Sequence, residues 1–351
     1  PMSATAHCRT RTERTQEQVT QMTAAIDPKL STALRRAAVR ATRAPSIHNT
    51  QPWRFKLTPD TLEIHADWGR QLRVLDPRGR QLLLSCGCAL FNARVALAAA
   101  GINATIERFA DPAQPDLVAR ILIDHTPMAD RHELAVLDAS IDERHTNRRQ
   151  FSDENVPVEV VATLVDAANI EGAEVFPVVR PEHRLSAARL SQRADQIENT
   201  DPAYRAELRA WTTDDPRRVD GVPASATPHV DAGADDDLPI RDFDTRGMGW
   251  LPTRTRSSLR QCLLLLGSVE DNPMAWLRAG EALERMLLEV TRLGYAASPL
   301  TQVIEVASTN QELRNDLRLT MHPHVLLRIG RAPAMLATRR RMLVDVITEA
   351  E

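Results

Sequence analysis

One ten-residue segment carries polar groups at a spacing suited to ligand binding. It reads Ala-Pro-Ser-Ile-His-Asn-Thr-Gln-Pro-Trp over residues 44–53. The first proline ends the preceding helix and the second opens a strand, so the residues between them must form a turn. Such a turn presents hydroxyl, amide and backbone donors that could bind the polar edge of a heterocycle. A plain helix-ending turn is the alternative interpretation.

A second segment, Arg-His-Thr-Asn-Arg at residues 144–148, could bind an anion. If the segment is helical, Arg144 and Arg148 lie four residues apart and share one face. With the Thr146 hydroxyl beside them they could bind a dianion, because charge-assisted arginine hydrogen bonds are roughly twice as strong as neutral ones. The alternative is a solvated basic face.

Together the two segments resemble a known family. The first is similar to the Pro-Ser-x-x-Asn-x-Gln-Pro-Trp signature of the FMN-dependent nitroreductases, and the second to their Arg-x-Ser-x-Arg phosphate-binding start, with threonine for serine. Ala-Ser-Pro-Leu-Thr-Gln at residues 297–302 resembles the segment that these enzymes place beside flavin N5. Arg-Arg-Arg at residues 339–341 resembles their C-terminal basic cluster. The resemblance covers residues 30–346 except an acidic insertion.

The resemblance implies a role for each matching residue. Arg144 and the three C-terminal arginines would hold the FMN phosphate, and Thr146 and Arg148 would reach the ribityl chain or the pyrimidine edge. The flavin would carry the chemistry, without a catalytic side chain. Gln302 departs from the family by standing where a glycine often lets substrate approach N5. The full set of implied cofactor-binding residues is Pro45, Ser46, His48, Asn49, Gln51, Arg144, His145, Thr146, Arg148, Pro299, Leu300, Thr301, Arg339, Arg340 and Arg341.

The order of these segments along the chain predicts how many sites it forms. Nitroreductases of this type are usually homodimers with each flavin at the subunit interface, the turn from one chain and the arginines from the other. Here the turn lies in the first half and the arginine segment opens the second, so one chain could build one whole site. Residues 170–176 stand where the second half should repeat the turn and lack its pattern. We therefore expect one FMN per chain and a monomer, most similar to the mycobacterial Acg-type nitroreductases.

The elements that must position these residues follow from hydrophobic periodicity and capping signals. In the first half we predict a helix over residues 27–43, a hairpin over 53–57 and 62–66, a buried helix over 81–100, and strands over 102–109 and 118–123. In the second half we predict helices over residues 156–170, 181–199 and 273–293, and strands over 173–179, 263–266 and 325–329.

These two series are similar enough to predict an internal duplication. Gly87-Cys88-Ala89-Leu90 precedes Gly101 by fourteen residues, and Gly280-Glu281-Ala282-Leu283 precedes Gly294 by the same fourteen. The expected fold is α+β, a tandem duplicated nitroreductase-like fold with two interlocked halves that mimic a dimer. The expected division is a polar N-terminal arm at residues 1–26, a first half at 27–140 and a second half at 141–351.

Within the second half, residues 212–250 form an acidic insertion without hydrophobic periodicity. A segment of this length inside a compact domain is usually a lid or a disordered insertion. Its last part could fold Met248 and Trp250 over a ligand, since glycines flank them. An aromatic side chain that anchors the insertion to the surface is an equally suitable interpretation.

Composition restricts the partners. The 351 residues include 44 basic and 47 acidic side chains, a formal charge of −3, which argues against nucleic acid. Four scattered cysteines and the lack of a secretion signal indicate a cytoplasmic protein, and apolar runs shorter than the roughly 20 residues needed to span a bilayer argue against a membrane. Neither Cys86-x-Cys88 nor His322-Pro323-His324 has the companions of a metal site, so we predict none.

The leading functional hypothesis is an FMN-dependent oxidoreductase. It would take hydride from NAD(P)H, bound transiently because the sequence has no Gly-x-Gly-x-x-Gly dinucleotide motif, and reduce a small-molecule acceptor such as a nitroaromatic or a quinone. Gln302 and the insertion motivate an alternative, a protein that binds and covers FMN with little or no turnover. A scaffold that has lost flavin is the third possibility.

Overall fold

The computed structural model describes residues 28–124, 126, 133–213, 215, 217–227, 238–243 and 261–349. The first half contains α2 (Pro28–Ala41), β1 (Trp53–Leu57), β2 (Thr61–Ala66), α3 (Arg80–Ala99), β3 (Asn103–Arg108), β4 (Leu117–Asp124) and α4 (Ser140–Glu143). The second half contains α5 (Val158–Ile170), β5 (Glu174–Pro177), α6 (Pro181–Thr200), α7 (Pro202–Ala210), β6 (Thr212–Thr213), β7 (Val222–Pro223), β8 (Cys262–Ser268), α8 (Pro273–Arg292), β9 (Ala296–Leu300), α9 (Gln302–Glu305), α10 (Ala307–Asp316), β10 (His322–Gly330) and β11 (Ile347–Glu349).

The two halves repeat one topology. The larger sheet has the strand order β11-β1-β2-β4-β3, and the second sheet has the order β5-β8-β10-β9. Without β11, the order β1-β2-β4-β3 matches the order β5-β8-β10-β9. In each sheet the first strand along the chain lies beside the second, the second beside the fourth, and the fourth beside the third, and all neighbours are antiparallel. In each half the long helix follows the second strand. The expected α+β fold with a tandem duplication is confirmed.

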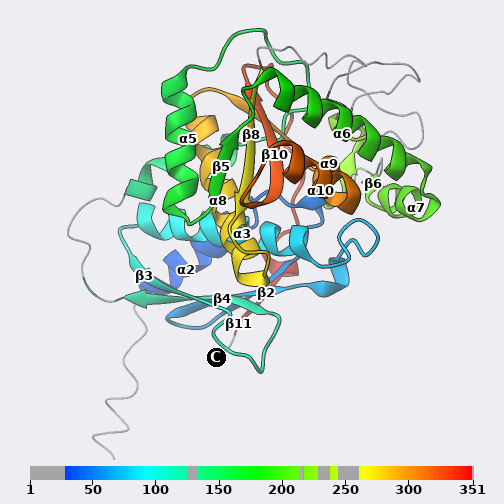
Figure 1. Cartoon of the computed structure of the whole chain (residues 1–351). Coiled ribbons are helices and arrows are strands. Elements are labelled where there is room, and N and C mark those ends of the chain that lie inside the picture. Colours follow the sequence, from blue (N-terminus) through cyan, green and yellow to red (C-terminus); the bar gives the residue numbers. More distant parts are fainter. Residues whose placement is uncertain are drawn as a thin grey trace, which may run out of the picture.

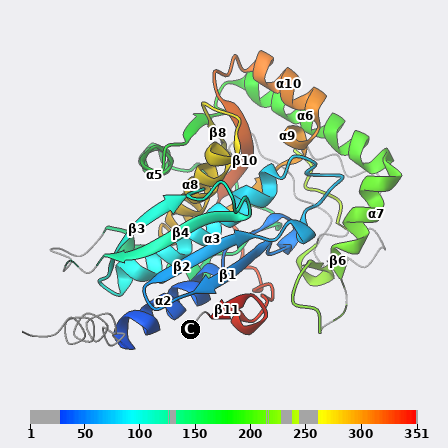
Figure 2. The same ribbon diagram turned by 90° about the horizontal axis from the view of Figure 1, so that it is seen from below.

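The long helices α3 and α8 form the centre of the molecule. One sheet lies on each side of them, and α6, α9 and α10 lie beside the second sheet, with α7 farther out next to β6 (Figures 1 and 2). Helix α3 is buried almost all round, which explains its apolar sequence. It is the one helix in the described ranges long and apolar enough to cross a bilayer, and it lies inside this core.

The crossing of α3 and α8 depends on two glycines at equivalent positions. A Cβ atom on Gly87 would lie 2.1 Å from the Leu277 carbonyl oxygen, and one on Gly280 would lie 2.1 Å from the Leu84 carbonyl oxygen. Each carbonyl belongs to the residue three positions before the other glycine, so the contact is reciprocal, as in a two-fold interface. The helices end at Gly101 and Gly294, with φ of +72° and +76°.

The C-terminal segment returns to the first half. Strand β11 pairs in parallel with β1, with Phe55 opposite Ile347, and so adds an edge strand to the first sheet. The sequence pattern predicts no strand in this segment, which we expect in the second half. Residues 331–342 on the way to β11 pass beside the turn at residues 46–51, where the Arg341 N–H donates to Gln51 Oε1 (2.7 Å).

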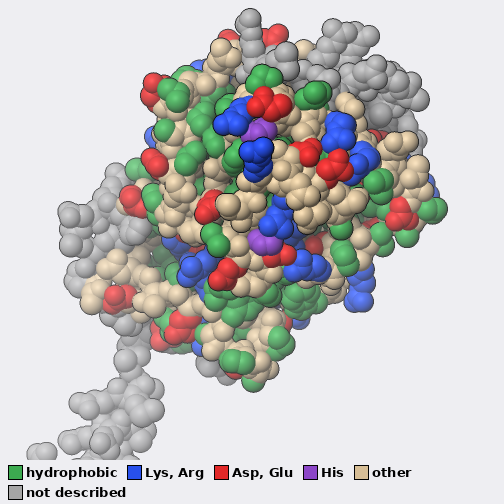
Figure 3. Space-filling view, viewed as in Figure 1, with side chains coloured by type: hydrophobic (Ala, Val, Ile, Leu, Met, Phe, Trp, Pro, Cys, Tyr) green, Lys and Arg blue, Asp and Glu red, His purple; other side chains and the backbone are tan. Residues whose placement is uncertain are grey.

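The described part of the acidic insertion packs against the body of the molecule. Strands β6 and β7 pair in parallel, and the side chains of Val222 and Phe243 are buried with Leu72, Tyr204 and Leu208. Met248 and Trp250 lie outside the described residues. On the face drawn in Figure 3, basic and acidic side chains are interspersed.

Candidate active site

The turn after α2 has an unusual backbone. His48, Asn49 and Gln51 have φ of 46°, 54° and 50°, the left-handed region that residues other than glycine rarely adopt. Such strain persists only where surrounding contacts hold it, and it is concentrated at functional sites. Here the Ser46 hydroxyl accepts the Gln51 N–H (2.9 Å), and the Ile47 N–H donates to the Ser85 hydroxyl on α3 (3.1 Å).

Side chains of the turn connect it to two distant segments. The Asn49 amide donates to the Gly221 carbonyl (3.0 Å) and to the Arg339 carbonyl (3.2 Å). The Gln51 amide donates to the Val219 carbonyl (2.8 Å). The signature residues therefore fasten the acidic insertion and the C-terminal segment to the first half.

The arginine segment is extended, so Arg144 and Arg148 do not share a helix face. Helix α4 ends at Glu143, Thr146 forms a parallel bridge with Ala297, and the Asn147 N–H donates to the Ala297 carbonyl (2.9 Å). Pairing with β9 extends the segment. Alternate residues of an extended chain point to the same side, so Arg144, Thr146 and Arg148 still face one pocket.

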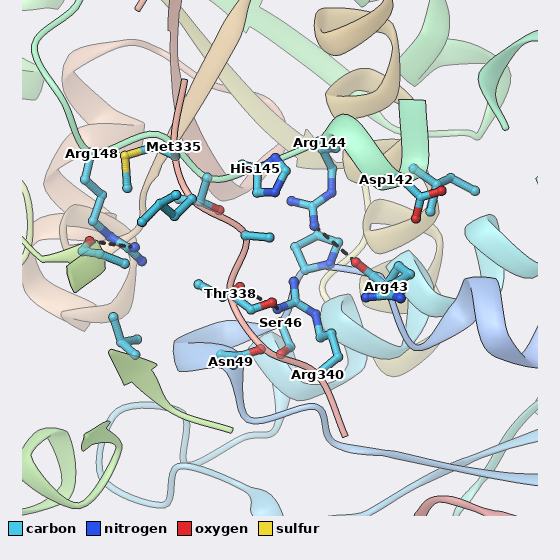
Figure 4. A pocket seen from close by; sticks show the side chains of 17 residues that line it. Arg43, Ser46, Asn49, Asp142, Arg144, His145, Arg148, Met335, Thr338 and Arg340 are labelled. Carbon is cyan, nitrogen blue, oxygen red and sulfur yellow. Dashed lines mark hydrogen bonds between the residues drawn. The ribbon is translucent and has the colours of Figure 1, made fainter. Parts of the chain in front are cut away.

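That pocket, called here the basic pocket, encloses about 760 Å³ open to solvent. Arg144 and Arg148 reach it from the extended segment, Arg340 from the C-terminal segment and Arg43 from the end of α2 (Figure 4). Its complete lining is Arg43, Pro45, Ser46, Asn49, Ile141, Asp142, Arg144, His145, Thr146, Arg148, Val222, Ala226, Met335, Leu336, Ala337, Thr338 and Arg340.

The basic pocket has an excess of positive charge. Burial and the Arg144 charge lower the pKa of Arg340 to about 9, and burial and the Arg241 charge lower that of Arg148 to about 10. No carboxylate of the described residues forms an ion pair with either side chain. Arg148 donates only to the Ala226 carbonyl (3.3 Å) among them and lies 4.9 Å from the Phe243 ring centroid. An anion in this pocket would relieve the repulsion.

A second pocket, called here the apolar pocket, adjoins the basic one. It encloses about 820 Å³, and the two share Pro45, Ser46, Thr146 and Arg148. Both halves build it, because its walls include side chains of α3, α8, β9 and the insertion. The rest of its lining is Ile47, His48, Gln81, Leu84, Ser85, Cys88, Ile240, Arg241, Phe243, Leu283, Leu287, Ser298, Pro299, Leu300, Thr301, Gln302 and Val325.

His48 is a buried polar group of the apolar pocket without a hydrogen-bond partner among the described residues. Neither ring nitrogen has a hydrogen-bond partner in the described structure, and the ring meets Phe243 edge-on at 5.1 Å. Burial, with the positive charges of Arg241 and Arg148, lowers the pKa of His48 well below its usual value. The ring is therefore a neutral imidazole, which offers one donor and one acceptor to a ligand.

Comparison with known proteins identifies the family. A Mycobacterium tuberculosis (strain ATCC 25618 / H37Rv) protein with the name "Putative NAD(P)H nitroreductase Rv3131" is 36% identical over 341 residues, covering 93% of this chain and 97% of the relative. This chain belongs to that nitroreductase family. "Putative NAD(P)H nitroreductase acg" of the same strain is 32% identical over 335 residues, covering 91% and 97%. A scan against protein-family models found no match to the sequence.

Among solved structures, the FMN-bound nitroreductase of Bacteroides fragilis NCTC 9343 aligns to this chain with 15% identity and a TM-score of 0.37. It covers 61% of this chain and 98% of that one.

The structure places most residues of the sequence-derived set around the two pockets of this nitroreductase-family protein. Pro45, Ser46, Asn49, Arg144, His145, Thr146, Arg148 and Arg340 line the basic pocket, and His48, Pro299, Leu300 and Thr301 line the apolar one. Gln51 and Arg341 line neither and hold the turn to the C-terminal segment, while Arg339 lines a neighbouring pocket. Gln302 lines the apolar pocket and donates its amide to Asp195 Oδ1 (2.6 Å).

Several pocket groups were missed from the sequence. Arg241 is one, and its guanidinium hydrogen-bonds the carboxylates of Glu198 and Glu305 and the Thr301 hydroxyl. Another is Glu284, buried on α8 behind the basic pocket. Glu281 and Glu284 stand on an otherwise apolar helix face, and that pattern could have signalled a buried ionic site.

The equivalent location in the other half is filled by ion pairs. With Gly87 and Gly280 superposed, Glu281 corresponds to Cys88 and Arg94 to Leu287, and these counterparts line the apolar pocket. Arg94 donates to both Glu171 and Glu281 at 2.6 Å. Further links run from Arg108 to Glu281 (2.6 and 2.8 Å) and from Arg285 to Glu171 (2.9 Å). A charged cluster thus replaces the apolar wall.

Proposed function

We propose that this chain is an FMN-dependent oxidoreductase that takes hydride from NAD(P)H and reduces a small-molecule acceptor such as a nitroaromatic or a quinone. The observation that supports it most is the junction of a basic pocket and an apolar pocket, built from both halves of one chain. FMN combines a phosphate dianion with a largely apolar ring system whose edge is polar. Names of relatives point to the same class of protein.

The residues present fit this cofactor. Arg144, Arg340 and Arg43 would bind the phosphate, because their charges converge on the basic pocket. The Asn49 Oδ1 atom is buried and has no hydrogen-bond partner within the described residues, so it is free to accept from a ligand. Leucine side chains of α3 and α8 would exclude water from the ring. Bound FMN would supply hydride and electron transfer at N5.

Arg148 would contribute electrostatically at the junction of the two pockets. Its guanidinium lies in a buried position near a second cation, Arg241, and has no carboxylate partner within the described ranges. A fixed positive charge at the polar edge of a flavin stabilises the negatively charged reduced form. We infer that Arg148 raises the reduction potential of the cofactor.

The test is the flavin content and reducibility of the purified protein. We expect close to one FMN per chain, bleaching by NADH or NADPH, and reoxidation by a nitroaromatic or quinone. Arg144→Ala should lose most of the flavin, whereas Arg189→Ala, at an exposed ion pair with Glu312, should retain it. Near-normal flavin retention in Arg144→Ala would show that Arg144 does not bind the FMN phosphate.

A specific observation favours the alternative of a flavin-covering protein with little turnover. Ile240, Arg241 and Phe243 of the insertion line the apolar pocket, and the Gln302 side chain stands in its wall. Flavin that dithionite reduces but neither nicotinamide nucleotide bleaches would establish this alternative over the oxidoreductase.

We further propose that the protein is a cytoplasmic monomer that does not depend on membrane or nucleic-acid partners. The reciprocal α3–α8 contact supports a monomer, because the chain already contains the two-fold arrangement that a dimer would supply. Light scattering of the eluted protein should give the mass of one chain. A stable dimer would contradict the proposal.

A further inference from the structure

Glu284 of α8 is a carboxylate without solvent contact that lies beside Arg144 of the basic pocket. Its side chain is 0% exposed, and neither oxygen has a hydrogen-bond partner in the described part of the chain. The nearest cation is Arg144, whose Nε lies 3.4 Å from Glu284 Oε1 and also has no hydrogen-bond partner there. A buried carboxylate is costly unless it is paired or protonated, so its charge depends on Arg144.

Groups from two further elements face this carboxylate. Arg340 approaches from the C-terminal segment, and Asn92 and Cys88 face it from α3. Burial raises the pKa of Glu284 to about 7, while the charge of Arg144, the Asn92 amide and the charge of Arg340 oppose the rise. Arg144 is thus placed between a carboxylate that it can pair and a pocket that can hold a second anion. The Arg144 Nη2 group donates a hydrogen bond to the Arg43 carbonyl (3.2 Å).

We propose that Glu284 is a proton-linked counterion of the phosphate-binding arginine: when a phosphate dianion binds in the basic pocket, one carboxylate oxygen of Glu284 takes up a proton from solvent. The inference rests on the proposed function, since it requires that Arg144 binds phosphate. No bond other than this O–H forms or breaks, and no electron is transferred. Glu284 is a positioning residue, because it acts through Arg144.

The direction of the linkage follows from electrostatics. A dianion beside Arg144 draws on the same guanidinium charge that stabilises the Glu284 carboxylate, and it adds negative charge to the pocket. The protonated form of Glu284 is therefore favoured in the complex. Binding takes up a proton, so affinity falls as pH rises above about 7, by up to tenfold for each pH unit. The phosphate ester is already a dianion there, because its second pKa is about 6.

The experiment is isothermal titration calorimetry of the full-length flavin-free chain with FMN. At pH 8, two phosphate-free buffers of different ionisation enthalpy report the number of protons exchanged. We expect uptake of most of one proton and nearly tenfold weaker binding at pH 9 than at pH 8. Riboflavin, which lacks the phosphate, should bind without proton uptake.

Two variants separate linkage from a structural role. Glu284→Gln keeps the shape but cannot take up a proton, so the heat should become nearly independent of the buffer. The affinity should become nearly independent of pH between 7 and 8, below the pKa of about 9 of Arg340. Asp142→Asn is the matched control, a carboxylate on the same pocket that is 58% exposed and paired with Arg40, and it should leave the pH slope unchanged.

The outcomes also separate this inference from the proposed function. If the wild-type chain binds neither FMN nor inorganic phosphate, both are overturned. If it binds FMN with heat that is independent of the buffer, or if Glu284→Gln keeps the wild-type pH slope, only the linkage is overturned. Should Glu284→Gln fail to fold, the proton count of the wild-type chain decides alone.

Discussion

The α3–α8 crossing makes Gly280→Ala a strong test of the duplicated architecture. In most helix interiors this change stabilises a protein by roughly 0.5–1 kcal/mol. Here the new Cβ would lie 2.1 Å from the Leu84 carbonyl oxygen, whereas ordinary contact begins at 3.4 Å. The helices must therefore separate by about 1.3 Å, and because the obstacle is backbone, the cost should reach the upper end of overpacking, about 3 kcal/mol.

Urea denaturation and flavin content measure the two consequences. The free energy of unfolding should fall by about 3 kcal/mol, and flavin content should fall too, because Leu84 and Leu283 from the two helices line the apolar pocket. Gly294→Ala is the control: φ is +76°, and no atom of the described residues lies within 4 Å of the added Cβ, so only backbone strain of about 1 kcal/mol applies.

A double-mutant cycle sharpens the test. Gly87→Ala strains the same crossing, so one separation of the helices accommodates both methyl groups, and the double variant should lose less stability than the two single losses together. A Gly280→Ala protein as stable as wild type, or fully additive losses, would refute the reasoning.

Two further predictions concern buried carboxylates. Glu281→Gln removes the negative partner of Arg108 and one of the two of Arg94, so unfolding by urea should show a loss of about 3 kcal/mol. A loss below about 1 kcal/mol would contradict a buried ionic role. Burial raises the pKa of Glu198 from 4.5 to about 8, so the folded state favours the protonated side chain. This contribution to the free energy of unfolding is complete below pH 4.5 and is lost as pH rises through 8. Glu198→Gln should therefore weaken the decline of the free energy of unfolding between pH 5 and 8, by up to about 1.4 kcal/mol per pH unit, and an unchanged slope would refute the assignment.

Local signals made the long helices predictable from sequence. Helix α8 was predicted over residues 273–293 and spans Pro273–Arg292, because the Asn272 side chain accepts the Ala275 N–H (2.9 Å) and Gly294 ends the helix. Helix α3 was placed within one residue at each end for similar reasons. Caps and apolar periodicity act within a few residues, so the sequence contains them in full.

The missed elements depend on distant partners. Strand β9 contains Pro299, which argues against a strand unless it lies at a sheet edge, and the structure places it at the edge beside β10. The extended form of the arginine segment likewise depends on Ala297, far along the chain.

The same division applies to the candidate site. Residues in contiguous motifs, such as Ser46 and Arg144, could be identified because the family pattern is local in sequence. Glu284 and Phe243 could not, because their roles come from neighbours that only the folded chain supplies.

The parallel pairing of β1 with β11 delays completion of the first sheet during synthesis. About 290 residues separate Phe55 from Ile347, and at 5–20 residues per second a ribosome needs roughly 15–60 s to make them. Throughout that interval the edge of β1 is open to pairing with other nascent chains. Slower growth or lower temperature during expression should therefore raise the yield of soluble protein more than stronger transcription does.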